Sequence, residues 1–236
     1  MGRVHDERLL SRRPRRIGHT RGMPRLSEVS RDDAHPFAQV MYKMLFGDRD
    51  PVAEPGTASG TPGNWWTVFA NCPDAFDHTT AGFQFYRSEN RELSARHREL
   101  GQCRAGYVAA SQFVFSQHCK AMRDVGFTDE QVEAIPNWST ADCFSLDERV
   151  LLAYTDCLVL EHGRVPEALF DQLKEHFSEV EIIEFTYITC TYAMHATMTK
   201  ALRLEYDDVD ERVQEVPDPD GNKAGLDVMA VVDTDG

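Results

Sequence analysis

The sequence lacks several features that mark well-known functional classes. No apolar run approaches the roughly 20 residues that a membrane-spanning helix needs, and Met1 is not followed by the apolar segment of a secretory signal. The net charge of −14 disfavours binding to nucleic acid or to an anionic membrane surface. We therefore expect a cytoplasmic protein with no nucleic-acid partner and no membrane partner.

The six cysteines include no Cys-x-x-Cys pair. In a chain without a secretory signal we expect them to be reduced and mostly buried. The sequence also has no His-x-x-x-His and no Glu-x-x-His spacing, which are typical of metal sites on helices. We predict no metal site.

Composition divides the chain into three parts. Residues 1–29 are basic and are predicted to be a flexible segment, within which Met23 is an alternative natural start. Residues 207–236 are acidic and are predicted to form an extended or partner-bound tail. The folded body is expected at 30–206, which is long enough for one domain with its own core.

The body shows helical signals and no strand alternation bounded by turns. Three segments open with the Ser/Thr-x-x-Glu/Gln pattern of a capping box, at Thr128, Ser145 and Ser178. The stretch after Ser178 is rich in β-branched and aromatic residues, as a strand would be. Its capping box and its continuation to Leu202 without turn residues favour one long buried helix instead. The sequence therefore predicts an all-α fold.

One stretch carries a recognisable pattern, reading Glu99-Leu-Gly-Gln-Cys-Arg-Ala-Gly-Tyr-Val-Ala-Ala-Ser111-Gln-Phe-Val114-Phe-Ser-Gln-His118. It resembles the signature of the carboxymuconolactone decarboxylase and alkylhydroperoxidase D superfamily. Redox-active members of that superfamily carry a Glu, a Cys-x-x-Cys pair and a His in this order. In this chain the two cysteine positions fall on Ser111 and Val114, so the thiols are missing.

The resemblance covers roughly residues 64–205. The Gly-Phe-Thr-Asp-Glu-Gln turn and the later Asp-Glu-Arg-Val-Leu-Leu-Ala-Tyr helix follow in the order of the family. The resemblance implies a helical bundle of this type. It also implies assembly as a homo-oligomer, a trimer or a hexamer.

Glu99 and His118 are 19 positions apart, which is about 28 Å along one straight helix. They meet only if the chain turns between them, and Ser111–Gln112 is the expected break because Ser competes for backbone hydrogen bonds. We predict that Glu99 orients His118 for proton transfer and that Ser111 donates a hydrogen bond to substrate or water. The alternative is a structural histidine and a surface glutamate. No Gly-x-Ser-x-Gly elbow surrounds Ser111, which disfavours a hydrolase triad.

Three further residues are predicted to bind substrate. His195 can hold a carboxylate or act as a second proton shuttle, or it can be a satisfied core histidine. Trp66 belongs to an aromatic group that suits a pocket for a ring compound, although such groups usually build cores or interfaces. Arg96 suits a substrate carboxylate, against the alternative of a solvated helix face.

Cys119 directly follows His118 but lies about 100° further round the helix. A single thiol also cannot form the intramolecular disulfide that peroxidase turnover needs. We therefore expect no thiol chemistry at this position.

These observations leave three functions open. The first is a cofactor-independent decarboxylase, lyase or isomerase acting on a small cyclic or aromatic-derived acid or lactone. The second is a thiol-independent relative of alkylhydroperoxidase with redox activity, and the third is a non-catalytic binding or scaffold protein. A cavity beside a Glu99–His118 contact favours the enzyme, whereas a pocket filled by Phe113, Phe115 and Tyr187 favours the scaffold.

Overall fold

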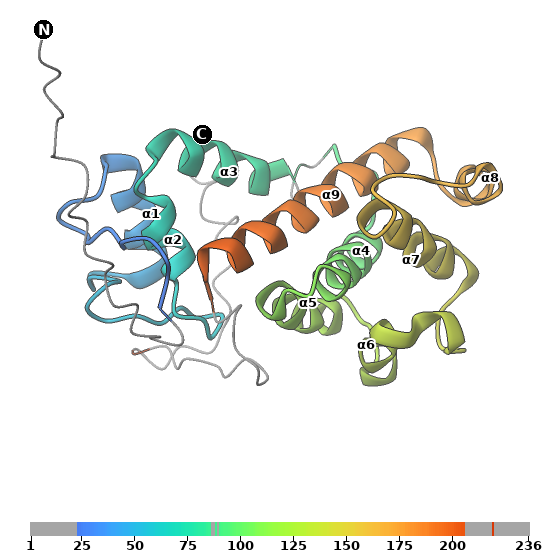
Figure 1. Ribbon diagram of the computed structural model, residues 1–236, viewed down its shortest axis with the longest axis horizontal. Coiled ribbons are helices and arrows are strands. Elements are labelled where there is room, and N and C mark those ends of the chain that lie inside the picture. Colours follow the sequence, from blue (N-terminus) through green and yellow to red (C-terminus); the bar gives the residue numbers. More distant parts are fainter. Residues whose placement is uncertain (1–22, 86–87, 89, 206–218, 220–236) are drawn as a thin grey trace, which may run out of the picture.

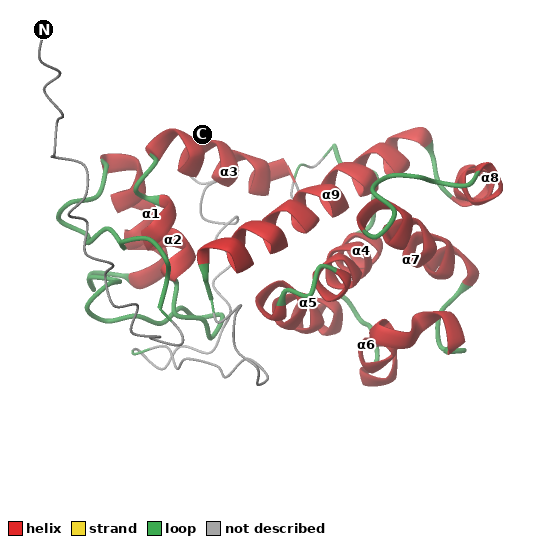
Figure 2. Ribbon diagram, viewed as in Figure 1, coloured by secondary structure: helices red, strands yellow, loops and turns green. Residues whose placement is uncertain are grey.

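The computed structural model describes residues 23–85, 88, 90–205 and 219. Every regular element in this part of the chain is a helix and none is a strand (Figure 2). The predicted all-α fold is thus confirmed for the described residues. The elements are α1 (Pro36–Phe46), α2 (Asn64–Phe69), α3 (Pro73–Phe85), α4 (Ala95–Val108), α5 (Gln112–Asp124), α6 (Asp129–Ala134), the 3-10 helix η1 (Ile135–Thr140), α7 (Leu146–Val159), α8 (Glu167–His176) and α9 (Glu179–Leu202).

Capping side chains fix where several of these helices begin. The three predicted capping boxes are present, at the starts of α6, α7 and α9. In the last of them Ser178 Oγ accepts the Glu181 backbone N–H at 3.1 Å, and the Glu181 carboxylate accepts the Ser178 N–H at 2.9 Å. Two donors that no helical carbonyl can reach are satisfied in this way. The box gives a local reason why this β-branched segment begins as a helix.

The helices form two groups joined by α9. Figure 1 shows α1, α2 and α3 at one end of the molecule, α4 to α8 at the other, and α9 running across both. Each end has a buried apolar cluster of its own. The first includes Tyr42, Phe46, Trp65, Phe76 and Leu204, and the second includes Leu100, Met122, Leu152, Phe185 and Ile188. Because α9 and the residues just after it contribute to both clusters, they hold the two ends together.

Two glycines allow other helices to approach α4 closely. A Cβ on Gly101 would lie 2.6 Å from the Phe185 ring of α9, and one on Gly106 would lie 2.7 Å from the Phe115 backbone nitrogen of α5. Neither neighbour leaves space for a side chain, since real Cβ atoms do not approach other heavy atoms so closely. α4 therefore packs tightly between α9 and α5.

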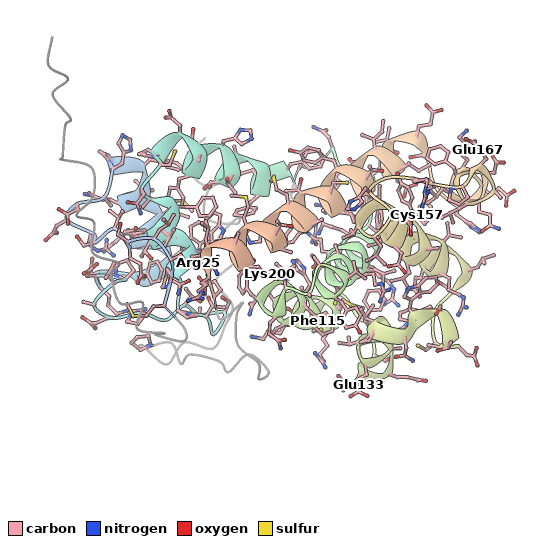
Figure 3. The ribbon with its side chains drawn as sticks, viewed as in Figure 1. Arg25, Phe115, Glu133, Cys157, Glu167 and Lys200 are labelled. Atoms are coloured by element: carbon pink, nitrogen blue, oxygen red, sulfur yellow. The ribbon has the colours of Figure 1, made fainter. Side chains whose placement is uncertain are left out.

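The chain reverses direction between α4 and α5. α4 ends at Val108, Ala110 has a φ of 53°, and Ser111 then caps α5 by accepting the Val114 backbone N–H at 3.3 Å. Lys200 of α9 donates to the Ala109 carbonyl at 3.1 Å and ties this turn to the bundle (Figure 3). The break predicted at Ser111–Gln112 is confirmed, and it brings His118 back beside Glu99.

The described part of the predicted N-terminal segment, residues 23–29, is bonded to the body. Arg25 lies beside the end of α9 (Figure 3), where its guanidinium donates to the Ala201 carbonyl at 2.9 Å. The predictions for residues 1–22 and for the acidic tail fall outside the described residues, apart from position 219. Within the described part, no helix combines the length and the apolar character needed to cross a membrane.

Candidate active site

Glu99 of α4 and His118 of α5 are in direct contact. His118 Nδ1 lies 2.7 Å from Glu99 Oε2, and both side chains are buried. A carboxylate can only accept, so the proton of this hydrogen bond belongs to His118 Nδ1. The neutral ring then carries a lone pair on Nε2, and the described residues provide no hydrogen bond to that atom. His118 is thus oriented as a base.

The Glu99 carboxylate is surrounded by donors. Arg98 donates to Oε1 from Nε at 3.0 Å and from Nη2 at 2.8 Å. The Gln102 amide, in the orientation that satisfies both side chains, donates to the two oxygens at 3.2 and 3.3 Å. Burial raises the pKa of Glu99, but the hydrogen bond from His118 and the positive charges of His118 and Arg98 outweigh burial and leave the pKa below its ordinary value. Glu99 therefore stays ionised at neutral pH and stabilises a protonated His118.

The pair borders a cavity of about 320 Å³ at the junction of the two helix groups. Most of its wall is apolar or aromatic, and a few polar groups converge on it. The aromatic part of the lining consists of Trp65, Trp66, Phe83, Phe113 and Tyr192, and the ionisable part consists of Glu99, His118, His195 and Glu205. Apolar walls with few polar groups are typical of small-molecule sites, and such sites prefer the junctions between structural units.

His195 of α9 lies in this cavity near His118. Its ring is 5.8 Å from the Tyr192 ring and 5.7 Å from the Trp65 ring, measured between centroids. Burial, assisted by the charge of His118, lowers the pKa of His195 to about 4. At neutral pH His195 is therefore uncharged and offers one hydrogen-bond donor and one acceptor. His195 was predicted to bind substrate, and the structure places it in the wall of the same cavity as Glu99 and His118.

Glu205 is a member of the cavity wall that the sequence analysis missed. Its side chain is buried, and its two carboxylate oxygens accept the backbone N–H groups of Trp65 at 2.8 Å and Gly63 at 3.2 Å. Burial raises the pKa of Glu205 to about 7, although these hydrogen bonds and one from Thr61 oppose the rise. In the sequence Glu205 stands at the start of an acidic stretch, so nothing local distinguishes it from a solvated charge.

The remaining predicted residues take different places. Trp66 lines the cavity. Ser111 is buried as the cap of α5 and does not belong to the described lining. Arg96 stacks over the Phe127 ring at 3.6 Å and pairs with Glu148 at 2.7 Å, away from the cavity. Ser111 and Arg96 are therefore occupied by contacts that stabilise the fold.

The cavity brings several possible metal ligands into one region. Even so, no group of three or more His, Cys, Asp or Glu side chains among the described residues is arranged to hold a metal ion. The chemistry that this arrangement supports directly is proton transfer by side chains.

Comparisons with known proteins find relatives of the helical part of the chain that carries this site. The model of the carboxymuconolactone decarboxylase family matches residues 74–156, a range that contains both Glu99 and His118. The uncharacterized protein YdfG of Bacillus subtilis (strain 168) is 25% identical over 102 residues, which make up 43% of this chain and 69% of that protein. The predicted resemblance to the carboxymuconolactone decarboxylase and alkylhydroperoxidase D superfamily is thus confirmed over residues 74–156.

Solved structures show the same fold. A protein of unknown function from Agrobacterium tumefaciens, with a proposed AhpD antioxidant role, is 24% identical with a TM-score of 0.53, over 57% of this chain and 92% of its own. An alkylhydroperoxidase AhpD core protein from Ralstonia eutropha JMP134 is 18% identical with a TM-score of 0.55, over 61% and 76%. A variant of the debrominase Bmp8 in complex with 2,3,4-tribromopyrrole is 14% identical with a TM-score of 0.56, over 77% and 91%.

Proposed function

We propose that this protein is a cofactor-independent acid–base enzyme, a decarboxylase, lyase or isomerase, that acts on a small ring compound. The observation that carries the proposal is the buried Glu99–His118 hydrogen bond of 2.7 Å, whose histidine opens onto an aromatic-lined cavity. A histidine that is fixed by a carboxylate on one nitrogen and faces a cavity with the other is equipped to move a proton.

In the proposed mechanism His118 Nε2 removes a proton from the substrate. Glu99 remains ionised and stabilises the imidazolium that forms, as its lowered pKa allows. Glu205, whose pKa is raised to about 7, holds a proton in part of the molecules at neutral pH and can donate it to developing negative charge. Neutral His195 supplies a further hydrogen bond to the substrate. The proton can return from His118 in the second half of the reaction.

The cavity suits a substrate with a single ring. Its volume of about 320 Å³ is at the lower end of the range for ligand pockets. Trp65 and Trp66 offer faces on which a planar ring can stack. The described lining contains no arginine or lysine that would pair with a carboxylate. Among the predicted substrates, a neutral lactone is therefore favoured over a free acid. A compound with a single ring, 2,3,4-tribromopyrrole, is bound by a variant of the structurally similar debrominase Bmp8.

The two alternative functions find less support. The positions of the family thiols are held by a helix cap, Ser111, and by Val114, so the redox alternative lacks the thiol pair that redox-active members of the superfamily use. The aromatic residues that would fill a scaffold pocket do not all do so. Phe113 lines the cavity, Phe115 packs on Tyr107 at 5.4 Å, and Tyr187 is exposed.

Solvent proton exchange tests the proposal without knowledge of the final product. The full chain is incubated in D₂O with a panel of five- and six-membered lactones and their ring-opened acids, and loss of the acidic C–H signal is followed by NMR. We expect faster exchange for at least one lactone, and a loss of about 10²- to 10⁴-fold in His118→Gln and Glu99→Gln.

His97→Gln is the matched control for this experiment. His97 also lies on α4 and also contacts a carboxylate, Asp147, at 3.1 Å, but it does not line the cavity. Its replacement should leave the exchange rate unchanged. Exchange that survives His118→Gln contradicts the proposal, and binding of the ring compounds without any exchange favours the binding-protein alternative.

We also propose that the protein assembles as a homo-oligomer, a trimer or a hexamer, as the resemblance implies. α9 exposes a line of side chains at alternating spacings of three and four residues, namely Val180, Ile183, Tyr187, Cys190, Met194 and Thr197. Ile183 is 67% exposed, Met194 is 55% exposed and Tyr187 is 51% exposed, which leaves an apolar stripe suited to a second helix. Light scattering of the wild type and of Ile183→Asp tests this, since the charge should dissociate the assembly.

A further inference from the structure

Cys103 and Cys119 face each other across the interface of α4 and α5. Their sulfur atoms are 3.7 Å apart, although 16 positions separate the two residues in the sequence. The expectation that Cys119 has no partner thiol is therefore wrong. The reversal at Ser111 folds α5 back onto α4 and brings the two cysteines together. No sequence motif predicts this pairing.

The cysteine pair lies next to the Glu99–His118 pair. Cys103 is one helical turn beyond Glu99 on α4, and Cys119 directly follows His118 on α5. Gly106 keeps the two helices close, because its missing side chain leaves room for the α5 backbone. The sulfur atoms need to approach by about 1.7 Å to reach the length of a disulfide bond. Rotation of the cysteine side chains can supply much of that distance, and a small shift of α5 can supply the rest.

The two thiols differ in exposure. Cys103 is fully buried, whereas Cys119 is only partly buried and is the more exposed residue of the two. Burial, together with the neighbouring Cys119 and Glu99, raises the pKa of Cys103. Cys103 is thus held as a thiol. Arg123 lies one turn beyond Cys119 and donates to its carbonyl at 3.2 Å, and its positive charge interacts with the Cys119 thiol group.

We propose that Cys103 and Cys119 form a reversible disulfide that joins α4 to α5 beside the Glu99–His118 pair, and that small hydroperoxides are the oxidant. The Cys119 thiolate attacks a peroxide oxygen, so that an S–O bond forms, the O–O bond breaks and an alcohol leaves. The Cys103 thiol then attacks the Cys119 sulfur, an S–S bond forms, and water leaves with the Cys103 proton. Two thiols are oxidised and one hydroperoxide is reduced.

The consequence is a redox-sensitive contact at the site. Because Cys119 and His118 are adjacent on α5, closing the disulfide moves the backbone that positions His118. This inference does not depend on the proposed acid–base activity, since it concerns the thiols alone. Either one can fail without the other.

Peptide mapping of the full chain tests the disulfide. The protein is treated with hydrogen peroxide, blocked with N-ethylmaleimide and digested without reductant. We expect the loss of two alkylatable thiols per chain, a linked peptide pair containing Cys103 and Cys119, and recovery of both thiols with dithiothreitol. In Cys103→Ala the oxidation of Cys119 should stop at a sulfenic acid that dimedone traps. Cys72→Ser, which removes an exposed thiol elsewhere, should leave the linked pair intact.

Two results overturn the proposal. One is that Cys103 and Cys119 both remain alkylatable under conditions that oxidise the exposed Cys72. The other is that Cys119 in the wild type proceeds to sulfinic acid or pairs with a different cysteine. If Cys103→Ala fails to fold, the wild-type peptide map still decides between these outcomes.

Discussion

Arg104 and Glu99 lie five positions apart on α4, and each makes a buried contact with an oppositely charged or polar partner on another helix. Arg104 donates to both carboxylate oxygens of Asp156, at 2.7 and 3.0 Å, and to the Ile135 carbonyl at 2.9 Å. Trp138 donates to the same Asp156 from its indole nitrogen at 3.0 Å. Every group in this contact is directed at another part of the protein, and neither charged partner lines the cavity.

The Glu99–His118 contact is buried more deeply than the Arg104–Asp156 contact, and its surroundings differ. Arg98, Gln102 and His118 donate hydrogen bonds to the Glu99 carboxylate. His118 also lines the cavity, and its Nε2 atom takes no part in this contact. The comparison shows that burial of charge does not by itself mark a site. What distinguishes the candidate site is a titratable atom, His118 Nε2, that the fold orients and that has no hydrogen-bond partner among the described residues.

Arg104→Leu sharpens this comparison with the largest expected effect. Removing the guanidinium leaves the Ile135 carbonyl without its donor and leaves Asp156 with only the Trp138 indole N–H and no cationic partner. Breaking a buried pair in this way costs about 3 kcal/mol of unfolding free energy. Urea unfolding measures the loss. The matched control is Arg123→Leu at the exposed Arg123–Asp129 pair, where we expect less than about 1 kcal/mol. Equal losses in both variants would remove the distinction between a structural and a surface pair.

Glu205→Gln extends the comparison to a buried carboxyl that has no cationic partner among the described contacts. The folded protein holds the Glu205 proton up to a pKa of about 7, whereas the unfolded chain loses it near the ordinary value of 4.5. The folded state thus binds more protons between these values, and wild-type stability falls as the pH rises through this window. The fall amounts to roughly 3 kcal/mol, since one pKa unit corresponds to about 1.4 kcal/mol.

The measurement for Glu205 is urea unfolding of the wild type and of Glu205→Gln at pH 5 and pH 8. Glutamine does not titrate, so the wild type should lose stability relative to the variant at the higher pH. A difference between the two proteins that is the same at both pH values would show that Glu205 is already ionised at pH 5. In that case it could not donate a proton at neutral pH.

Glu99→Gln gives the opposite dependence on pH. The pKa of Glu99 is lowered in the folded protein, so its contribution to stability is complete above the unfolded pKa and is lost as the pH falls through the folded value. At pH 7 we expect a loss of about 2 kcal/mol, as for other hydrogen bonds to a charged group. The loss should shrink as unfolding is measured at lower pH. A constant loss between pH 7 and pH 3 would mean that the His118 and Arg98 contacts do not depend on the Glu99 charge.

Local signals were enough to predict most of the fold. The capping boxes at Thr128, Ser145 and Ser178 depend on side chains only three positions apart, so the sequence contains all that they need. The break at Ser111 was predictable for the same reason. The Glu99–His118 contact also depends on that turn, and the family pattern pointed to it in advance.

Contacts between distant segments could not be predicted from the sequence. Glu205 reaches the start of α2 across more than 140 positions, and in the sequence it resembles the solvated charges that follow it. Cys103 and Cys119 meet because α5 folds back over α4, a register that no spacing rule specifies. Arg96 resembles a substrate anchor in the sequence because its partner, Glu148, lies 52 positions away.

Ser111→Ala has the smallest expected effect and decides between two roles for one residue. As the cap of α5, Ser111 accepts the Val114 N–H, and its loss should cost about 1 kcal/mol of unfolding free energy. Ser178→Ala, at the start of α9, removes a comparable cap away from the cavity, where Ser178 Oγ accepts the Glu181 N–H at 3.1 Å, and should cost a similar amount. Neither substitution should change the rate of deuterium exchange, because Ser111 does not line the cavity. If Ser111→Ala alone slows exchange while both variants stay folded, Ser111 contacts the substrate, as the sequence first indicated. The cavity must then open further along α5 when the substrate binds.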